Sequence, residues 1–253
     1  MARFSQSIKG VRIILKTMPG FILRQTPYRN ADTILTVLTA EGFLTIQANG
    51  ALKMTSPFQA ATTLGAWTKF TVRESRSKGY LEKAELIQFA PLPTKEGMLA
   101  TMMMEAILQV ILFDESDTEG PTLYAMLSNL RNHWETPQLT YLRFLLQYLK
   151  LQGIPLIVDY CVQCQSKKQI VGVSQALGGF ICQGCIHQVS AKRLSAKALT
   201  LLRSLQQETL SKTEDVASLN TLINVVHDHV RYHLDTRFIG FDNIESILSK
   251  IHS

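Results

Sequence analysis

Between residues 20 and 90, short apolar runs alternate with polar and turn-forming residues, which is the pattern of β-strands joined by tight turns. Pairs such as Asn49-Gly50 and Ser56-Pro57 mark breaks between the runs. The runs cover residues 20–26, 33–39, 43–49, 68–75 and 80–90. Five short strands in one segment predict a small β-barrel of the OB-fold kind.

Residues 1–17 precede this pattern and are basic and partly apolar, without clear periodicity. Two structures are compatible with them: an ordered extra strand around residues 11–15, or a flexible arm. The sequence pattern leaves both alternatives open.

After Pro93 the chain changes to helical spacing, and glycine and β-branched residues become fewer. Residues 98–113 are apolar nearly all round, which predicts a helix buried among other helices. Thr136 and Pro137 resemble an N-cap followed by a first-turn proline. Apolar residues three or four apart predict further helices over residues 123–133, 138–152, 195–207 and 219–234.

All four cysteines of the chain fall into two Cys-x-x-Cys pairs, CVQC and CQGC, with seventeen residues between the pairs. This spacing fits a tetrathiolate zinc site made of Cys161, Cys164, Cys182 and Cys185. Four protein ligands leave no open coordination position, so we expect one structural zinc ion. Two disulfides or four free thiols are the alternatives, and His187 is expected to be a surface neighbour.

These patterns predict an α+β protein of several domains. A basic extension over residues 1–19 precedes an OB-fold nucleic-acid-binding domain over 20–93. A helical domain occupies residues 94–158 and 188–253. The four-cysteine zinc finger, residues 159–187, is inserted between its two parts.

The composition is that of a folded protein, with 46% hydrophobic and 18% charged residues. The first residues contain cations among the apolar positions and so have no signal-peptide core. The most apolar run, 98–113, is too short to span a bilayer. We therefore expect a cytoplasmic protein that does not enter a membrane.

Positive charge is concentrated in the first third of the chain. Residues 1–80 hold eleven Lys and Arg against three acidic residues, a net charge of +8, whereas residues 81–160 have a net charge of −5. A basic module beside aromatic residues such as Trp67 and Phe70 favours polyanion binding, with a solvated basic face as the alternative. The candidate DNA contacts are Arg24, Arg29, Lys53, Lys69, Arg73, Arg76 and Lys78.

Motifs of common enzymes are missing from the sequence. There is no GxxxxGK[ST], GxGxxG or GxSxG stretch, and the basic module lacks the carboxylate cluster of a metal-dependent nuclease. His229 and His233 are one helical turn apart, but HExxH is absent, so we expect a solvated or capped pair. These absences disfavour an ATPase or nuclease and indicate a protein without catalytic residues.

The order of these parts resembles the RecO family of bacterial recombination mediators and DNA repair proteins. The most telling stretch is GFILRQTPYRNADTILTVLTAEG, followed by AELIQF, the CVQC and CQGC pairs, and HVRYHLDTRF. The resemblance covers nearly all of residues 20–241. Members usually carry a Gly-Ala-Arg basic stretch after the third strand, and here residues 49–53 read NGALK, so one cation is missing.

The resemblance implies a barrel that binds single- and double-stranded DNA and anneals complementary strands without ATP. It also implies partnership with RecR and with single-stranded DNA-binding protein, and indirect action on the recombinase RecA. The acidic middle third suits protein partners. Its outlying cations Arg131, Arg143 and Lys150 are candidates to receive the acidic tail of the single-stranded DNA-binding protein, against ordinary solvated charge.

Rival functions remain at this stage. One is a zinc-ribbon regulator that recognises duplex sequence through Lys167, Lys168, Lys192 and Arg193 of the finger. A second is an assembly adaptor whose barrel binds protein rather than DNA. A metal-dependent hydrolase comes last.

Overall fold

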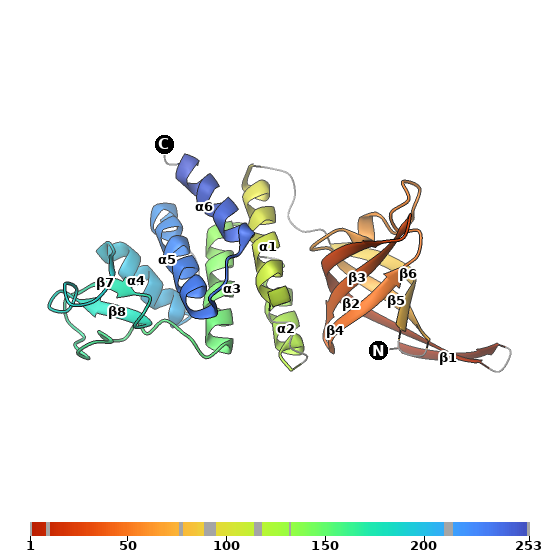
Figure 1. The fold of residues 1–253 in the computed structure, drawn as a ribbon, viewed down its shortest axis with the longest axis horizontal. Helices are drawn as coiled ribbons and strands as arrows, with labels where there is room; N and C mark the ends of the chain where they lie inside the picture. Colours follow the sequence, from red (N-terminus) through yellow and green to blue (C-terminus); the bar gives the residue numbers. More distant parts are fainter. Residues whose placement is uncertain are drawn as a thin grey trace. The chain divides into compact units, whose positions relative to one another are not determined.

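The computed structural model describes residues 2–8, 11–75, 78–88, 95–113, 118–131, 133–209 and 215–251. Contacts between residues divide the chain into two compact units, Met1–Asn132 and His133–Ser253. The first unit contains a β-barrel, and the second contains helices and a small sheet (Figure 1). The finer domain boundaries at residues 19, 93, 158 and 187 stay predictions.

The first unit is built on a closed five-stranded barrel. Its strands run in the order β2-β3-β4-β6-β5, and β2 pairs again with β5 to close the ring. Among the described strands of the barrel, only β4 and β6 pair in parallel, and a short 3-10 helix, Ala60–Thr62, lies between β4 and β5. This topology confirms the OB-like fold. The strands are β1 Ala2–Ile8, β2 Val11–Tyr28, β3 Asp32–Thr39, β4 Gly42–Ala48, β5 Trp67–Ser75 and β6 Lys78–Gln88.

Strand β2 is much longer than the sequence pattern indicated. It starts at Val11, nine residues before the expected start at Gly20, and its first part pairs with both β1 and β5. The open question about residues 11–15 is therefore answered in favour of an ordered strand.

The barrel core consists of alternate residues of each strand, as expected for side chains that point to opposite faces of a sheet. Ile22, Val37, Ile46 and Phe70 are fully buried in it. Phe58, from the segment between β4 and β5, packs against the same cluster and anchors that segment to the barrel.

Helix α1 (Lys95–Phe113) and helix α2 (Gly120–Leu130) follow the barrel, and α2 packs on β3 and β4. A Cβ atom at Gly120 would lie 2.7 Å from the Cα atom of Gly42, so this close approach requires glycine. Helix α2 begins three residues before the predicted start because Pro121 occupies its first turn.

The described residues of the second unit form four helices, α3 (Pro137–Leu151), α4 (Ala196–Gln206), α5 (Val216–Leu234) and α6 (Ile239–Ile251). Helices α3, α4 and α6 all contact α5. Thr136 is the N-cap of α3 and Pro137 is in its first turn, as predicted, although the Thr136 side chain makes no capping hydrogen bond. Within the described residues, no helix combines the length and apolar character that crossing a bilayer requires.

A three-stranded sheet lies between α3 and α4 along the chain; Cys182 ends its strand β8, and the other three cysteines lie in the adjoining turns. Its strands, β7 (Ile170–Ser174), β8 (Gly179–Cys182) and β9 (Lys192–Arg193), run in the order β8-β7-β9. A Cβ atom at Gly179 would lie 2.5 Å from the carbonyl oxygen of Ile157. Glycine is therefore needed where the chain leaving α3 crosses β8.

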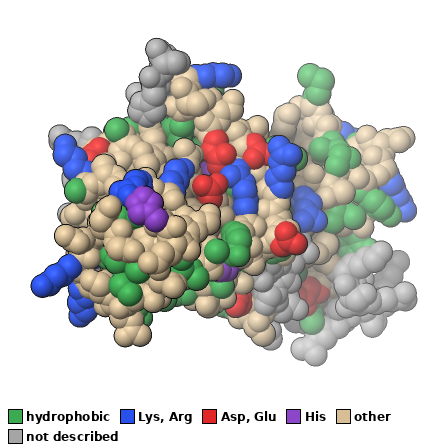
Figure 2. Space-filling model, turned by 60° about the vertical axis from the view of Figure 1, so that its left-hand side comes forward, with side chains coloured by type: hydrophobic (Ala, Val, Ile, Leu, Met, Phe, Trp, Pro, Cys, Tyr) green, Lys and Arg blue, Asp and Glu red, His purple; other side chains and the backbone are tan. Residues whose placement is uncertain are grey.

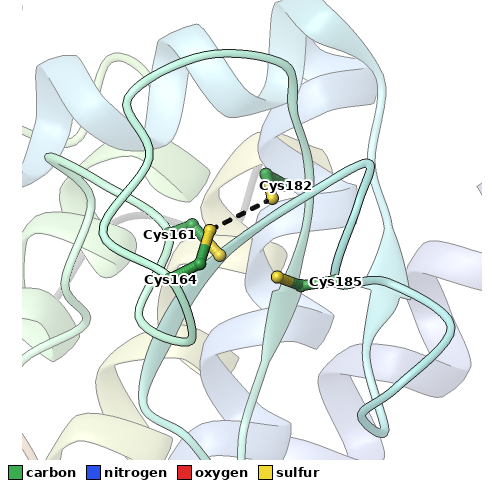
Figure 3. Close-up of side chains that lie close together, drawn as sticks. All are labelled: Cys161, Cys164, Cys182 and Cys185. Carbon is green, nitrogen blue, oxygen red and sulfur yellow. Dashed lines mark hydrogen bonds between the residues drawn. The ribbon is translucent and has the colours of Figure 1, made fainter.

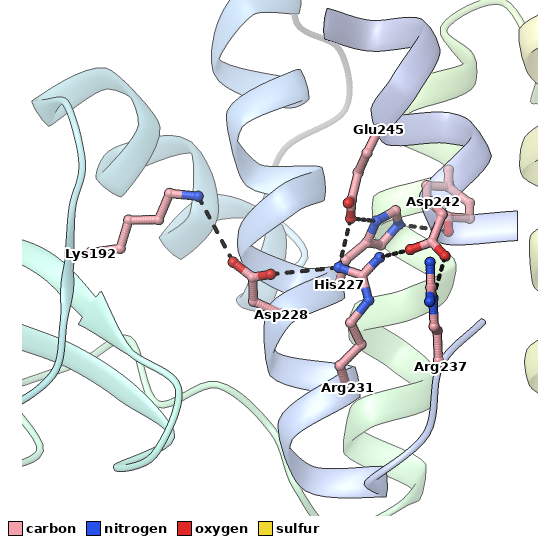
Figure 4. Close-up of polar contacts among 8 residues, drawn as sticks. Lys192, His227, Asp228, Arg231, Arg237, Asp242 and Glu245 are labelled. Carbon is pink, nitrogen blue, oxygen red and sulfur yellow. Dashed lines mark hydrogen bonds and ion pairs between the residues drawn. The ribbon is translucent and has the colours of Figure 1, made fainter. Parts of the chain in front are cut away.

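Helices α3, α5 and α6 are joined by a chain of polar contacts that is buried at Tyr141 and His227 and partly exposed at Glu245 (Figure 4). The Tyr141 hydroxyl lies 2.8 Å from His227 Nε2, and His227 Nδ1 lies 2.7 Å from Glu245 Oε1. Burial raises the pKa of Tyr141, so its hydroxyl stays protonated and donates to Nε2, which leaves Nδ1–H to donate to Glu245. Arg231 donates to Glu245 and Asp242, which fastens α6 to α5.

Candidate metal centre and nucleic-acid interface

The four cysteine thiols converge on one point in the second unit, from two loops of the finger (Figure 3). Their sulfur atoms all lie within 4.8 Å of one another, and those of Cys164 and Cys182 are 3.6 Å apart. Cys161, Cys182 and Cys185 are buried, whereas Cys164 is exposed. Within the described residues, this is the cluster of His, Cys and acidic side chains that could hold a metal.

The spacing of the sulfur atoms matches a tetrahedral zinc site. A zinc–sulfur bond of about 2.3 Å places tetrahedral ligands about 3.8 Å apart, so little movement would be needed. All four candidates from the sequence lie in the cluster, and the exposed His187 is not part of it. The cluster can therefore bind a metal with four thiolates.

Tight backbone turns present these sulfur atoms. The N–H of Cys161 donates to the carbonyl of Ser166, and the N–H of Gln165 donates to the carbonyl of Cys161. Gln165 adopts φ of 62° in this turn, so a glutamine rather than a glycine takes the left-handed conformation there. In the second pair, the N–H of Cys185 donates to the carbonyl of Cys182.

The pKa values of the thiols indicate that a negative charge on one sulfur atom disfavours a negative charge on its neighbours. Burial disfavours a charged Cys161, but backbone N–H groups of Cys182 and Cys164 donate to its sulfur, and its pKa falls to about 6. A hydrogen bond with the Cys164 thiol, and then burial, raise the pKa of Cys185 to about 12. A divalent cation would remove this conflict, because it stabilises all four thiolates together.

The finger is fastened to the helices by side chains of α4 and α5. Arg203 donates to the carbonyl of Val158 and lies 5.3 Å from the centre of the Phe180 ring. His229 and His233 each place Nε2 3.0 Å from a carbonyl oxygen, of Ile154 and Gln175 respectively. The prediction of a capped pair is confirmed, but His229 is buried rather than solvated.

In the barrel, two exposed cations lie on neighbouring segments. The β2–β3 turn carries Arg29, and the loop after β4 carries Lys53. The N–H of Leu52 donates to the carbonyl of Ala31 at 3.0 Å, which joins the turn to the loop. In the described part of the chain, no acidic side chain lies within ion-pair distance of either cation. Arg24 is also exposed, on β2.

Two other candidate cations already have acidic partners on β6. Lys69 lies 3.5 Å from Glu85, and Arg73 lies 2.6 Å from Glu82. Exposed ion pairs of this kind are weak, but each pair has no net charge to offer a phosphate. Arg76 lies outside the described residues, as does the side chain of Lys78.

The aromatic residues offer less stacking surface than the sequence indicated. Phe70 is buried in the barrel core. Trp67 is half-buried, and the Arg131 guanidinium lies 3.8 Å from the centre of its ring. Arg131, a candidate partner contact, is thus engaged in a cation–π contact within its own unit.

The other two candidate partner contacts, Arg143 and Lys150, line one pocket of the second unit. The pocket has a volume of about 170 Å³. Lys150 donates to Glu208 and to the carbonyl of Gln206. The pocket is lined by Arg143, Leu146, Gln147, Lys150, Leu205 and Glu208.

Two of the four cations that the sequence offers for duplex recognition, Lys192 and Arg193, have partners of their own, whereas Lys167 and Lys168 are exposed. Lys192 lies 3.9 Å from Asp228, and Arg193 donates to Gln183. On the face in Figure 2, positive side chains stand apart and are interspersed with acidic ones. The contacts of Lys192 and Arg193 weaken the support for duplex recognition through these two residues.

Sequence reasoning missed the chain of polar contacts among Tyr141, His227 and Glu245. Tyr141 and His227 are 86 positions apart, and no local motif joins them. The only signal was the placement of His227 on the apolar face of the helix over residues 219–234.

The described residues thus form a protein of the class that combines a closed OB-like barrel with a helical unit and an inserted four-thiol finger. The model of the "Recombination protein O N terminal" family matches residues 13–90, and that of the "Recombination protein O C terminal" family matches residues 98–238. The second match alone covers more than half of the chain. The chain belongs to the RecO family.

Curated relatives agree with this family along most of their length. A protein of Halalkalibacterium halodurans named DNA repair protein RecO is 27% identical over 241 residues, which cover 90% of this chain and 94% of the relative. The protein of that name from Bacillus subtilis is 24% identical over 249 residues, 92% of this chain and 96% of the relative. The RecO resemblance of the sequence is confirmed.

Proposed function

We propose that the chain is a recombination mediator that binds single- and double-stranded DNA through its barrel and anneals complementary strands without ATP. In this proposal it cooperates with RecR and with single-stranded DNA-binding protein, and so helps to load RecA. The observation that supports it most strongly is the family match over both units. No step in this function requires a catalytic residue.

The proposed mechanism is charge neutralisation. Two DNA strands repel each other, and a basic surface that holds both lowers this repulsion while some base edges stay available for pairing. Phosphate contacts carry little sequence information, so we expect weak sequence preference and strong salt dependence.

Arg29 and Lys53 are the proposed centre of the DNA contact. They are exposed, lie on segments joined by the Leu52–Ala31 hydrogen bond, and have no acidic partner in the described part of the chain. Arg24 is proposed to extend the surface along β2. Arg76 and Lys78 would add charge at the β5–β6 turn, as the sequence predicts.

The variant Arg29→Ala with Lys53→Ala tests this assignment. On single strands, the slope of log affinity against log salt is expected to become shallower by about 1.4, because each phosphate contact contributes about 0.7. Fluorescence anisotropy of a labelled oligonucleotide at several salt concentrations measures the slope.

The control removes a paired cation with its partner, Lys69→Ala with Glu85→Ala, and leaves the net charge unchanged. Its slope is expected to match the wild type. A shallower slope in this control, with the Arg29 and Lys53 variant unchanged, would place the DNA contact on the β5–β6 face instead.

We also propose that the four thiolates hold one structural zinc ion. Zinc suits this site because it favours tetrahedral thiolate coordination, and four protein ligands leave no position for a reacting water. The ion would fix the two cysteine loops relative to each other, and thereby the finger against α4 and α5.

The pocket of α3 and α4 is proposed to receive the acidic tail of single-stranded DNA-binding protein. Arg143 offers positive charge there, and Leu146 and Leu205 offer apolar surface beside it. Lys150 would exchange its weak pair with Glu208 for the incoming carboxylate.

An Arg143→Glu variant is expected to anneal protein-coated strands at least fivefold more slowly than the wild type, because charge reversal repels the acidic tail. Annealing of naked strands should not change. Titration of a labelled peptide with the tail sequence measures binding directly. Equal slowing on naked strands would show that Arg143 contacts DNA and not the tail.

A further inference from the structure

Met54 is the most exposed large apolar side chain among the described residues. It follows Lys53 in the loop after β4, and 92% of it is accessible to solvent. Leu52, two residues earlier, is 40% exposed. A single exposed apolar side chain is ordinary, so the significance of Met54 depends on what holds it and what surrounds it.

The loop that carries Met54 is held firmly at both ends. The N–H of Gly50 donates to Asp32 at 2.8 Å, and the N–H of Ser56 donates to the carbonyl of Lys53 at 2.9 Å. Ala51 is buried, and Phe58 packs on the barrel core. The loop therefore presents Met54 to solvent in a fixed position, although Met54 could gain about 1.5 to 3 kcal/mol by burial.

The surroundings of Met54 are basic and include one aromatic ring. Lys53 is its neighbour in the chain, and the joined β2–β3 turn adds Arg29, whose guanidinium lies 5.1 Å from the centre of the Tyr28 ring. Asp32 is the acidic residue of this turn, and one of its oxygens accepts the hydrogen bond from Gly50. An apolar tip flanked by two cations complements a polyanion with apolar faces.

We propose that Met54 and Leu52 contact the faces of unstacked bases in single-stranded DNA, while Arg29 and Lys53 hold neighbouring phosphates. This inference rests on the proposed DNA-binding function and names the part of DNA that these segments recognise. Paired bases in a duplex present their edges, and their faces are covered by stacking. The contact therefore favours single strands over duplex.

Such a contact would also assist annealing. A base held by its face against Met54 keeps its pairing edge exposed to a complementary strand. The cations lower repulsion between the strands, and the apolar tip keeps the held strand unstacked.

The test is Met54→Ala, compared with Met98→Ala as a matched control. Met98 is a second exposed methionine, at 56%, on α1. Affinity for a single-stranded oligonucleotide is expected to fall about five- to tenfold in Met54→Ala, with the salt slope unchanged because no phosphate contact is removed. Duplex affinity and the Met98→Ala control should match the wild type.

A second variant, Met54→Trp, gives a direct signal. Stacking on bases should quench its added fluorescence when single-stranded DNA binds, beyond any change in the wild type. Normal single-strand affinity in Met54→Ala would overturn the inference, as would an equal loss on duplex. Lost binding to a protein partner with normal DNA affinity would assign the tip to a protein interface.

The two proposals fail in different ways. If the wild type does not bind DNA, the proposed function is wrong. If the wild type binds with the expected salt dependence but Met54→Ala is normal, only the base contact is wrong.

Discussion

Replacing both Cys161 and Cys164 by serine is expected to abolish zinc binding and to unfold the finger. Structural zinc supplies on the order of 10 kcal/mol to isolated finger peptides, and hydroxyl groups do not replace thiolates as its ligands. The finger packs on α4 and α5 through the contacts of Arg203 with Phe180 and of His233 with Gln175, so its loss should lower the stability of the second unit by several kcal/mol. Solubility should fall with it.

Metal content and thermal unfolding measure this result. The wild type should carry one zinc ion per chain, and the double variant none, with an earlier unfolding transition. Gln163→Ser, a change at an exposed position inside the same Cys-x-x-Cys loop, is the control and should retain zinc. A double variant with normal stability and lost DNA binding would contradict a structural role.

The second large effect is expected from His227→Ala. His227 is fully buried, bonded to Tyr141 and Glu245, and stacked on Phe241 with ring centres 3.9 Å apart. Its removal leaves a cavity and a buried Tyr141 hydroxyl without its partner, whereas Glu245 keeps the hydrogen bond from Arg231. The free energy of unfolding should fall by about 3 kcal/mol or more.

Chemical denaturation of the wild type and variants measures this loss. Tyr141→Phe removes one hydroxyl and should cost less, about 1 to 2 kcal/mol. His187→Ala, at an exposed position, should change stability by less than about 0.5 kcal/mol. If His227→Ala costs no more than His187→Ala, this chain of polar contacts does not hold α6 to the bundle.

Lowering the pH should reduce the stability of the fold through two buried histidines, His227 and His229. Burial lowers the pKa of His227 below its ordinary value of 6.5, and burial lowers that of His229 to about 4. The unfolded chain then binds protons more readily than the folded chain, so their contribution to stability is complete above about pH 6.5. This contribution to stability is lost as the pH falls from about 6.5 through about 4. The His227→Ala variant should lose less stability over this range than the wild type, because it lacks one of the two histidines.

Much of the fold could be predicted because it follows local patterns. Alternating apolar residues located strands β3 to β6, and spaced leucines located α3, α4 and α5. Helix α6 was missed, although Phe241, Ile244 and Leu248 are spaced for one apolar helical face and are all buried. The extension of β2 to Val11 was left open because its start pairs with two other strands, and local pattern does not reveal such pairing.

The metal cluster could be predicted from four cysteines, because their spacing is itself the signal. Which basic residues are engaged in ion pairs could not be predicted. Lys69 and Arg73 meet Glu85 and Glu82 only through the register of β5 and β6, which shifts at irregularities near Thr68 and Val72. The surroundings of Trp67 likewise could not be predicted, because its ring contacts Arg131, a residue that follows the barrel in the sequence.

The most direct test of the proposed function is the annealing of two complementary fluorescent oligonucleotides coated with single-stranded DNA-binding protein, in the absence of ATP. The wild type is expected to accelerate pairing, and Arg29→Ala with Lys53→Ala should lose most of this acceleration. The Lys69→Ala and Glu85→Ala control should keep it. Failure of the wild type to accelerate pairing on either coated or naked strands would contradict the mediator function.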